Sequence, residues 1–546
     1  MTRSLVGLLL FALLPASALA QLEAIAHPRS GAKDTPAPGI ASSTSPPPRA
    51  PAPRRVATAA SATSAGPTAS TPPAAATSCD TPTAATPEPR GSDATAATPP
   101  PSTNTAPPTT PTSPAPDAHV GRFDFGSYGR VGVGSDLRGQ LGRSANVVAH
   151  GPRLIEDPYA ELELRREDEW GQVKSRVVAT MAFFAPFFHF SGSVDQRIGL
   201  RNLYAEARAG DRFALWAGSR MYRGDDVYLL NFWPLDDLNT LGGGADIRLT
   251  DATTLKVHAG MQRLDTPSQY QLVASGNPIG AGSVPVARLD RPRLIESVKL
   301  THEIPLGAVG LRLSAYAEAH QLAAGVQRNP VTGDEQALPS DWGLLGGAQL
   351  SVWTEGTRFA HVWFRHARGL AVYDELTAPT TFNNELTTQG ANSTRLALAG
   401  GWDATHAGVM VGGYVDFVRD AGPSQATAQK YDEGALSVRG QWYATKLFGL
   451  ALETSYQRRT YGLVDPATGQ LRSGGVAQFG VMPYFAPLGH GLFARPQLRL
   501  VYALSLRDAG AQSLYADADP FAHRGVEHYL GVSVEWWFNS STYPVR

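Results

Sequence analysis

The chain has 546 residues, with 47 basic and 48 acidic side chains and a formal net charge of −1. This balance gives no overall field that would attract nucleic acid or a strongly acidic partner. Cys79 is the only cysteine, which excludes an intramolecular disulfide framework.

The first 20 residues have the pattern of a secretory signal peptide. Arg3 supplies the positive charge, residues 5–14 form the apolar run, and Ala-Leu-Ala at 18–20 gives the small-residue cleavage site. That run is too short to span a bilayer, and no later stretch has about 20 consecutive apolar residues. The sequence therefore predicts an exported protein without a helical membrane anchor.

The next segment, residues 21–120, is dominated by Pro, Ala, Thr and Ser. Such a composition cannot bury enough apolar surface to offset the entropy of ordering, so it predicts a disordered periplasmic segment with polyproline II content. Two roles fit this composition: an arm that reaches the peptidoglycan, and a linker with no further role.

Residues 121–546 are predicted to be one all-β domain. Between 123 and 538 apolar and polar residues alternate with a period of two, over stretches separated by turn residues. At 311–319, for example, Leu and Ala alternate with Arg, Ser, Tyr and Glu. A soluble sandwich or small barrel with such strands is usually complete well before about 400 residues.

The alternative is a transmembrane antiparallel β-barrel, which turns its apolar face to lipid and its polar face to a wet lumen. Full charges on the polar faces and an aromatic last strand at 532–538 favour this architecture. At about ten residues a strand, the domain has room for about 16 to 18 strands, enough for an aqueous channel. With the signal peptide, this predicts the outer membrane of a Gram-negative cell.

One stretch, residues 215–237, begins as a strand and then stops alternating. It gathers charged and amide side chains around aromatic rings, including Arg223, Asp226, Asn231 and Trp233. Such groups bind sugar hydroxyls, and aromatic faces cover the C–H face of a pyranose. A surface loop held by salt bridges is the other interpretation of this stretch.

Residues 123–538 resemble the maltoporin family of sugar-specific outer-membrane porins. FDFGSYGRVGVG (123–134) and RLIEDPYAELEL (153–164) resemble its first two strands, the stretch from 215 resembles its inward-folded third loop, and 494–500 and 534–538 resemble its final strands. The resemblance implies an 18-stranded barrel, a homotrimer in outer-membrane lipid, and passive diffusion of oligosaccharides. In this family the sugar follows a path of aromatic rings, the greasy slide, flanked by ionic residues.

The resemblance assigns the slide to Tyr128, Tyr159, Phe493 and Trp537, with Trp233 at the constriction. The strand pattern gives independent support for Tyr159 and Trp537, because both fall on a polar face that also carries glutamate. An aromatic on a wet face usually has a ligand, and an interfacial girdle is the alternative position for such a ring.

The ionic track is assigned in the same way to Arg130, Arg153, Glu161, Arg201, Asp226 and Asn231. Arginine donates hydrogen bonds and carboxylate accepts them, so a sugar can exchange one hydroxyl contact for the next. The same charges can also hold loops by salt bridges and set ion preference.

Several positions depart from the family pattern and leave the identity of the sugar open. Asn231 stands where the family has an acid, and Gly224 where it has an arginine, with Arg223 beside it as a substitute. No aromatic occupies Gly356, at the periplasmic end of the slide, where Phe359 or Trp363 are the substitutes. The loop at 191–200 lacks the tryptophan that the family lends to a neighbouring subunit.

Three other functions remain open: a general diffusion porin, an outer-membrane hydrolase, and a tether between the outer membrane and the cell wall. No nucleophile motif supports catalysis, and the acidic cluster at 225–237 lacks calcium-loop spacing. We therefore expect neither an enzyme nor a cofactor. The expected partners are an oligosaccharide, outer-membrane lipid, further copies of the chain, and peptidoglycan or a periplasmic sugar-binding protein.

Overall fold

A computed structural model describes residues 120–184, 197–280, 282–329, 332–354, 357–423, 429–466 and 468–541. The predicted signal peptide, Cys79 and the predicted arm up to residue 119 lie outside the described residues. So do Gly356 and most of the 191–200 loop. No helix in the described ranges is long and apolar enough to cross a membrane.

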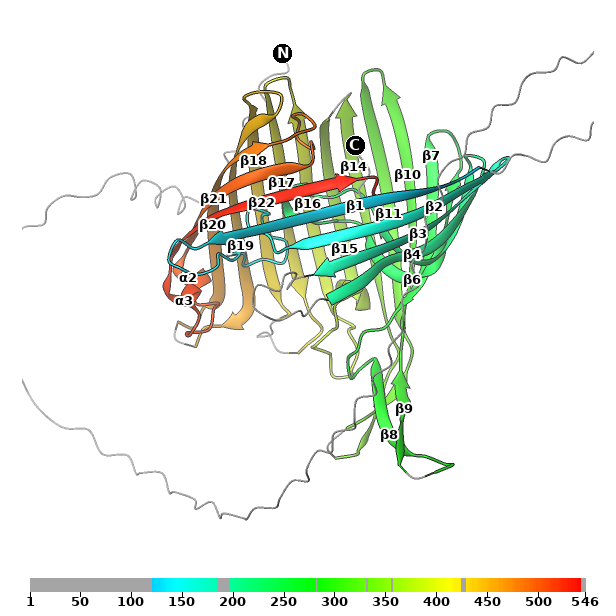
Figure 1. Cartoon of the computed structure of the whole chain (residues 1–546). Helices are drawn as coiled ribbons and strands as arrows, with labels where there is room; N and C mark the ends of the chain where they lie inside the picture. Colours follow the sequence, from blue (N-terminus) through cyan, green and yellow to red (C-terminus); the bar gives the residue numbers. More distant parts are fainter. Residues whose placement is uncertain are drawn as a thin grey trace, which may run out of the picture. The chain divides into compact units, whose positions relative to one another are not determined.

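Eighteen antiparallel strands form one closed sheet (Figure 1). β1 (Val120–Ser135) pairs with both β2 (Tyr159–Trp170) and β22 (Val526–Phe538), and this pairing closes the barrel. Closure leaves no sheet edge, which hydrocarbon requires because unpaired backbone groups find no water there. The predicted barrel of about 16 to 18 strands is confirmed at its upper value.

The other barrel strands follow one another around the sheet in chain order. They are β3 (Val173–Phe184), β4 (Arg197–Ala209), β5 (Phe213–Arg223), β6 (Asp237–Arg248), β7 (Thr253–Gln262), β10 (Arg293–Leu306), β11 (Val309–Leu322), β14 (Asp341–Thr354), β15 (Arg358–Gly369), β16 (Asn392–Asp403), β17 (Ala407–Arg419), β18 (Tyr431–Tyr443), β19 (Phe448–Val464), β20 (Leu471–Phe485) and β21 (Gln497–Arg507).

The two ends of the barrel differ in the length of their connections. Short turns such as 171–172 and 307–308 lie at the end where β1 begins and β22 ends, and long loops such as 136–158 lie at the other. Outer-membrane barrels have short periplasmic turns and long extracellular loops, which orients this one. Two of the long loops carry β-hairpins that lie outside the barrel sheet. One pairs β8 (Tyr270–Gly276) with β9 (Ser283–Asp290), and the other pairs β12 (Gly325–Arg328) with β13 (Glu335–Leu338). The hairpin of β8 and β9 projects from the barrel (Figure 1).

Alternation along each strand separates a lumen face from an outer face, as predicted. On β11, Ser314, Tyr316 and Glu318 are buried inside the barrel, whereas Leu313 is 46% exposed on the outside. Two predicted strands begin later than expected, at residues 159 and 497 rather than 153 and 494. A proline precedes each start, and proline has no N–H to donate to a ladder.

Several extracellular connections fold into the barrel. Loop 224–236, with helix η2 (Tyr228–Leu230), folds inward, which confirms the predicted inward-folded loop. Loop 136–158 also folds inward, and this was not predicted. Loop 370–391, with η3 (Leu370–Val372), and the connection 508–525, with α2 (Ala509–Gln512) and α3 (Pro520–His523), join the same apolar cluster. Its members include Val147, Leu230, Phe232, Trp363, Tyr414 and Phe521. This packing fills the lumen mainly against β14–β20, and the open cavities lie nearer the other strands.

Candidate functional site

Two cavities lie inside the barrel, on either side of three shared residues. The inner cavity, of about 490 Å³, reaches the periplasmic ends of β7, β10 and β11. The outer cavity, of about 200 Å³, lies against loop 136–158 and the extracellular ends of β1 and β2. Both are lined by Arg223, Asn231 and Trp233, which therefore form the constriction between them.

Loop 224–236 builds this constriction by turning back on itself. The Val227 N–H donates to the Phe232 carbonyl at 2.7 Å, and Asn231 lies in the left-handed region at φ 49°, which asparagine tolerates better than most residues. The Arg223 guanidinium lies 4.1 Å over the Trp233 ring and donates to Asp237. A cation and an aromatic face are thereby fixed together where the two cavities meet.

The local packing explains why the chain has glycine at 224. A Cβ at this position would lie 2.1 Å from Oδ1 of Asp236, and the other Asp236 oxygen is 2.7 Å from the Lys299 amine. An arginine at 224 would have to displace this ion pair. The guanidinium at the constriction comes instead from the neighbouring Arg223.

Aromatic rings line the route from the outer cavity to the constriction. The Phe184 and Tyr159 centroids are 5.7 Å apart, and those of Tyr159 and Tyr128 are 6.0 Å apart. Trp537 is directly opposite Tyr128 on the β1–β22 ladder and packs against the same cluster. Tyr159 lines the outer cavity, and Tyr128 and Trp537 line the inner one.

This row of rings, called the aromatic file below, continues to the periplasmic end of the barrel. Tyr228 lies 6.2 Å from Trp537 and 5.6 Å from Phe493, and Phe359 lies 6.1 Å beyond Phe493. Of the two predicted substitutes for the ring absent at Gly356, Phe359 is the one that lies next to Phe493. Tyr228 was not assigned from the sequence, although it belongs to the stretch singled out there, because its place in the file depends on how η2 folds inward.

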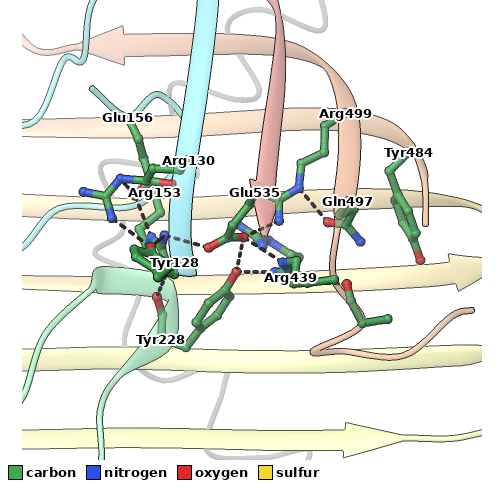
Figure 2. Close-up of polar contacts among 12 residues, drawn as sticks. Tyr128, Arg130, Arg153, Glu156, Tyr228, Arg439, Tyr484, Gln497, Arg499 and Glu535 are labelled. Carbon is green, nitrogen blue, oxygen red and sulfur yellow. Dashed lines mark hydrogen bonds and ion pairs between the residues drawn. The ribbon is translucent and has the colours of Figure 1, made fainter. Parts of the chain in front are cut away.

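A buried carboxylate on β22 ties these elements together (Figure 2). Glu535 is 2% exposed and lies 3.0 Å from Arg153, 2.8 Å from Arg495 and 2.6 Å from Arg499. The Tyr228 hydroxyl donates to the same carboxylate at 2.7 Å. This hub fastens three connections to the barrel wall. Sequence analysis missed it, since Arg153 and Tyr228 are 382 and 307 residues away along the chain.

Two residues of the predicted ionic track hold a slide tyrosine in place. The Tyr128 hydroxyl accepts hydrogen bonds from Arg130 and Arg153, each at 3.0 Å. Both arginines pair with Glu156, at 3.3 and 2.7 Å. Arg153 lines the inner cavity and Arg130 the outer one, so each can also meet a solute.

The remaining predicted residues divide between the cavities and the wall. Arg201 lines the outer cavity and donates to the Tyr159 hydroxyl at 3.0 Å, and Asp226 lines the inner cavity. Glu161 is 1% exposed and lines neither, and its carboxylate accepts from Tyr159. All the predicted site residues except Glu161 thus line one of the two cavities.

The outer cavity also contains an uncharged histidine from loop 136–158. His150 stacks on Phe232 with a centroid distance of 3.8 Å. Burial lowers the pKa of its imidazole to about 3, so it is neutral at pH 7. No group of three or more histidine, cysteine or carboxylate side chains in the described part of the chain is arranged to hold a metal ion.

Loop 370–391 contributes a carboxyl group that titrates near neutral pH. Glu375 is 6% exposed, and its Oε2 accepts the Asn239 backbone N–H at 2.6 Å. Burial raises the pKa of Glu375 to about 8, and the nearby Asp237 carboxylate adds to the rise. The hydrogen bond from Asn239 opposes this rise but does not cancel it, so the folded state favours the protonated carboxyl group. The stability that goes with the protonated form is fully present below about pH 4.5 and is lost as the pH rises through about 8, because the buried group must then ionise.

We therefore expect loop 370–391 to loosen between pH 6 and 9 in the wild type and not in Glu375→Gln. Limited proteolysis of the loop at the two pH values measures this. Glu385→Gln, an exposed position of the same loop, is the matched control and should behave as the wild type. Equal pH dependence in Glu375→Gln and the wild type would contradict the assignment.

The comparisons with known proteins agree with this architecture. The LamB porin family matches residues 123–538. A maltoporin of Vibrio cholerae serotype O1 is 25% identical over 445 residues, which cover 76% of this chain and 94% of that protein. Among solved structures, Pseudomonas aeruginosa OpdO is 12% identical (TM-score 0.37; 77% and 97% of the two chains), and the outer-membrane channel DcaP of Acinetobacter baumannii is 9% identical (TM-score 0.39; 76% and 97%).

Proposed function

This chain belongs to the LamB porin family and is a porin of the outer membrane rather than an enzyme, and from this we propose that it selects oligosaccharides and lets them diffuse passively along its aromatic file. The observation that carries the proposal is the continuity of that file. From Tyr228 to Phe359, successive ring centroids are 5.6 and 6.1 Å apart, so a sugar can meet the next ring before it leaves the last.

The rings have to bind the sugar weakly for this to work. A dissociation constant in the millimolar range, about −4 kcal/mol, allows entry and still permits release, whereas a tight site would stop flux. Sugar rings stack their C–H faces on Trp537 and Phe493 in turn. Each step breaks one stacking contact as it forms the next, so no single step has a high barrier.

The polar residues of the constriction serve the hydroxyl groups of the sugar. Arg223 and Asn231 offer donors there, and Asp226 in the inner cavity offers acceptors. Exchange among them keeps each hydroxyl paired while the ring moves. The same charges also exclude apolar solutes, which gain nothing from these contacts.

A purified-channel experiment tests the proposal directly. Ion current through the protein in a planar bilayer is titrated with malto-oligosaccharides, the class suggested by the name of the Vibrio relative, and with sucrose. We expect concentration-dependent, saturable block by at least one class. Steady current without block by any sugar would instead indicate a general diffusion porin.

The parts of the chain outside the barrel complete the proposal. We propose that residues 1–20 are a cleaved signal peptide, that 21–120 form a periplasmic arm in contact with peptidoglycan or a sugar-binding protein, and that three copies assemble in the membrane. N-terminal sequencing of the mature protein and chemical cross-linking in outer membranes test the first and last of these. Pull-down of peptidoglycan with and without residues 21–118 tests the arm.

A further inference from the structure

The inner cavity has a second wall that the aromatic file does not use. It is formed by β7, β10 and β11, which lie nearly across the barrel from β22 and β1 in the strand order. The residues of this wall that line the cavity are basic and hydroxyl side chains together with one carboxylate: Thr254, Lys256, Lys299, Thr301, Glu303, Arg312 and Ser314. A solute stacked on Trp537 or Phe493 therefore presents its other side to amines and hydroxyls.

Two lysines of this wall are direct neighbours. Lys256 and Lys299 are paired across the β7–β10 ladder, an arrangement in which like charges repel. Lys299 is compensated by Asp236, 2.7 Å away. Arg312, on the next strand, is compensated by two carboxylates, Asp225 at 3.1 Å and Glu303 at 3.0 Å.

Lys256 differs from these cations. Among the described residues its amine makes no hydrogen bond or ion pair, and the nearest ring, that of Tyr222, has its centroid 6.0 Å away. Asp246 is its register neighbour on β6 but forms no ion pair with it. Arg220 and Arg223 line the same small side cavity as Lys256, but each of them is paired, Arg220 with Glu206 at 3.0 Å and Arg223 with Asp237. A charged side chain left without a partner inside a membrane-spanning segment is costly, and such residues usually mark a solute pathway.

The other cations of the inner cavity all have partners. The described residues that line it include five cations, and each of them except Lys256 is paired with a carboxylate: Arg153 with Glu156, Arg223 with Asp237, Lys299 with Asp236 and Arg312 with Asp225. The neutral Asn231 at the constriction adds no negative charge that would repel an anion.

We propose that the inner cavity binds saccharides that carry an anionic group, a carboxylate or a phosphate, with the sugar ring on the aromatic wall and the anion at the Lys256 amine. The anion offsets the repulsion between the two lysines and gives Lys256 the partner that the protein does not supply. This inference rests on the proposed sugar channel and names the class of its substrate.

Block of single-channel current by matched solutes tests the proposal. The probes are maltotriose, a galacturonate trimer, glucose, glucose 6-phosphate, inorganic phosphate and acetate. In the wild type we expect the anionic member of one of two pairs to block at a concentration about tenfold lower than its neutral counterpart, because it gains a charge-assisted contact. The pairs are the galacturonate trimer with maltotriose, and glucose 6-phosphate with glucose. Which of the two pairs shows the effect identifies the anionic group.

Lys256→Gln should abolish this advantage, so that the galacturonate trimer and maltotriose block at similar concentrations. Lys256→Arg keeps the positive charge and should retain the advantage of the anionic sugars. If the two variants fold equally well, loss of this advantage in Lys256→Gln cannot be ascribed to misfolding. Lys446→Gln, in an exposed periplasmic turn, is the matched control and should equal the wild type.

The outcomes separate the two proposals. Block by maltotriose without any advantage for the anionic sugars overturns this inference alone. The inference also fails if inorganic phosphate or acetate blocks as strongly as the anionic sugars, because the site would then recognise the ion without the sugar. Absence of block by every saccharide overturns the proposed sugar selectivity itself.

Discussion

The Glu535→Gln variant should have a free energy of unfolding about 3–5 kcal/mol lower than the wild type, the usual cost of removing one partner from a buried ion pair. Glutamine keeps the shape of the side chain but leaves Arg153, Arg495 and Arg499 without their shared carboxylate. The glutamine has one acceptor oxygen where the carboxylate has two, so the Tyr228 hydroxyl competes with the arginines for it and the ring in the middle of the file is held less firmly. We expect weaker sugar block as well as lower stability.

Urea unfolding in detergent micelles measures the first effect, and sugar titration of the ion current measures the second. Glu169→Gln is the matched control, because Glu169 pairs with Lys174 at 3.2 Å on a surface where both side chains are more than half exposed. Exposed pairs of this kind contribute at most about 1 kcal/mol. If Glu535→Gln unfolds at the same urea concentration as Glu169→Gln, the hub does not stabilise the barrel.

Replacing Trp537 with alanine should raise the sugar concentration needed for half-maximal block by about 10- to 100-fold, because a stacking surface worth on the order of 1.5–3 kcal/mol is removed. Ion conductance should stay the same or rise, since the ring lines the inner cavity and its removal widens the path. Tyr159→Ala should act in the same direction at the outer cavity.

Trp402→Ala is the control for this series. Trp402 lies on β16 with 48% of its surface exposed on the outside of the barrel, so its loss should leave sugar block unchanged. Unchanged sugar block in both Trp537→Ala and Tyr159→Ala would remove the aromatic file from the transport route. Equal loss in Trp402→Ala would show that the effect comes from the stability of the barrel.

The class of fold, and the face on which each strand residue lies, follow from the local pattern of the sequence. A period of two is a local property of the backbone, so the alternation around Tyr159 or along 311–319 was enough to place side chains toward lumen or lipid. The resemblance to a family added an ordered set of candidate residues. All of these except Glu161 line one of the two cavities.

The residues that meet across the lumen are known only from the folded barrel. The hub around Glu535 joins loops that are hundreds of residues apart, and the inward fold of loop 136–158 depends on apolar contacts with distant strands. The place of Tyr228 in the file and the missing partner of Lys256 also depend on contacts between segments that are distant in the sequence. Closing a barrel brings together segments whose contacts have no local period, so no pattern along the chain can reveal them.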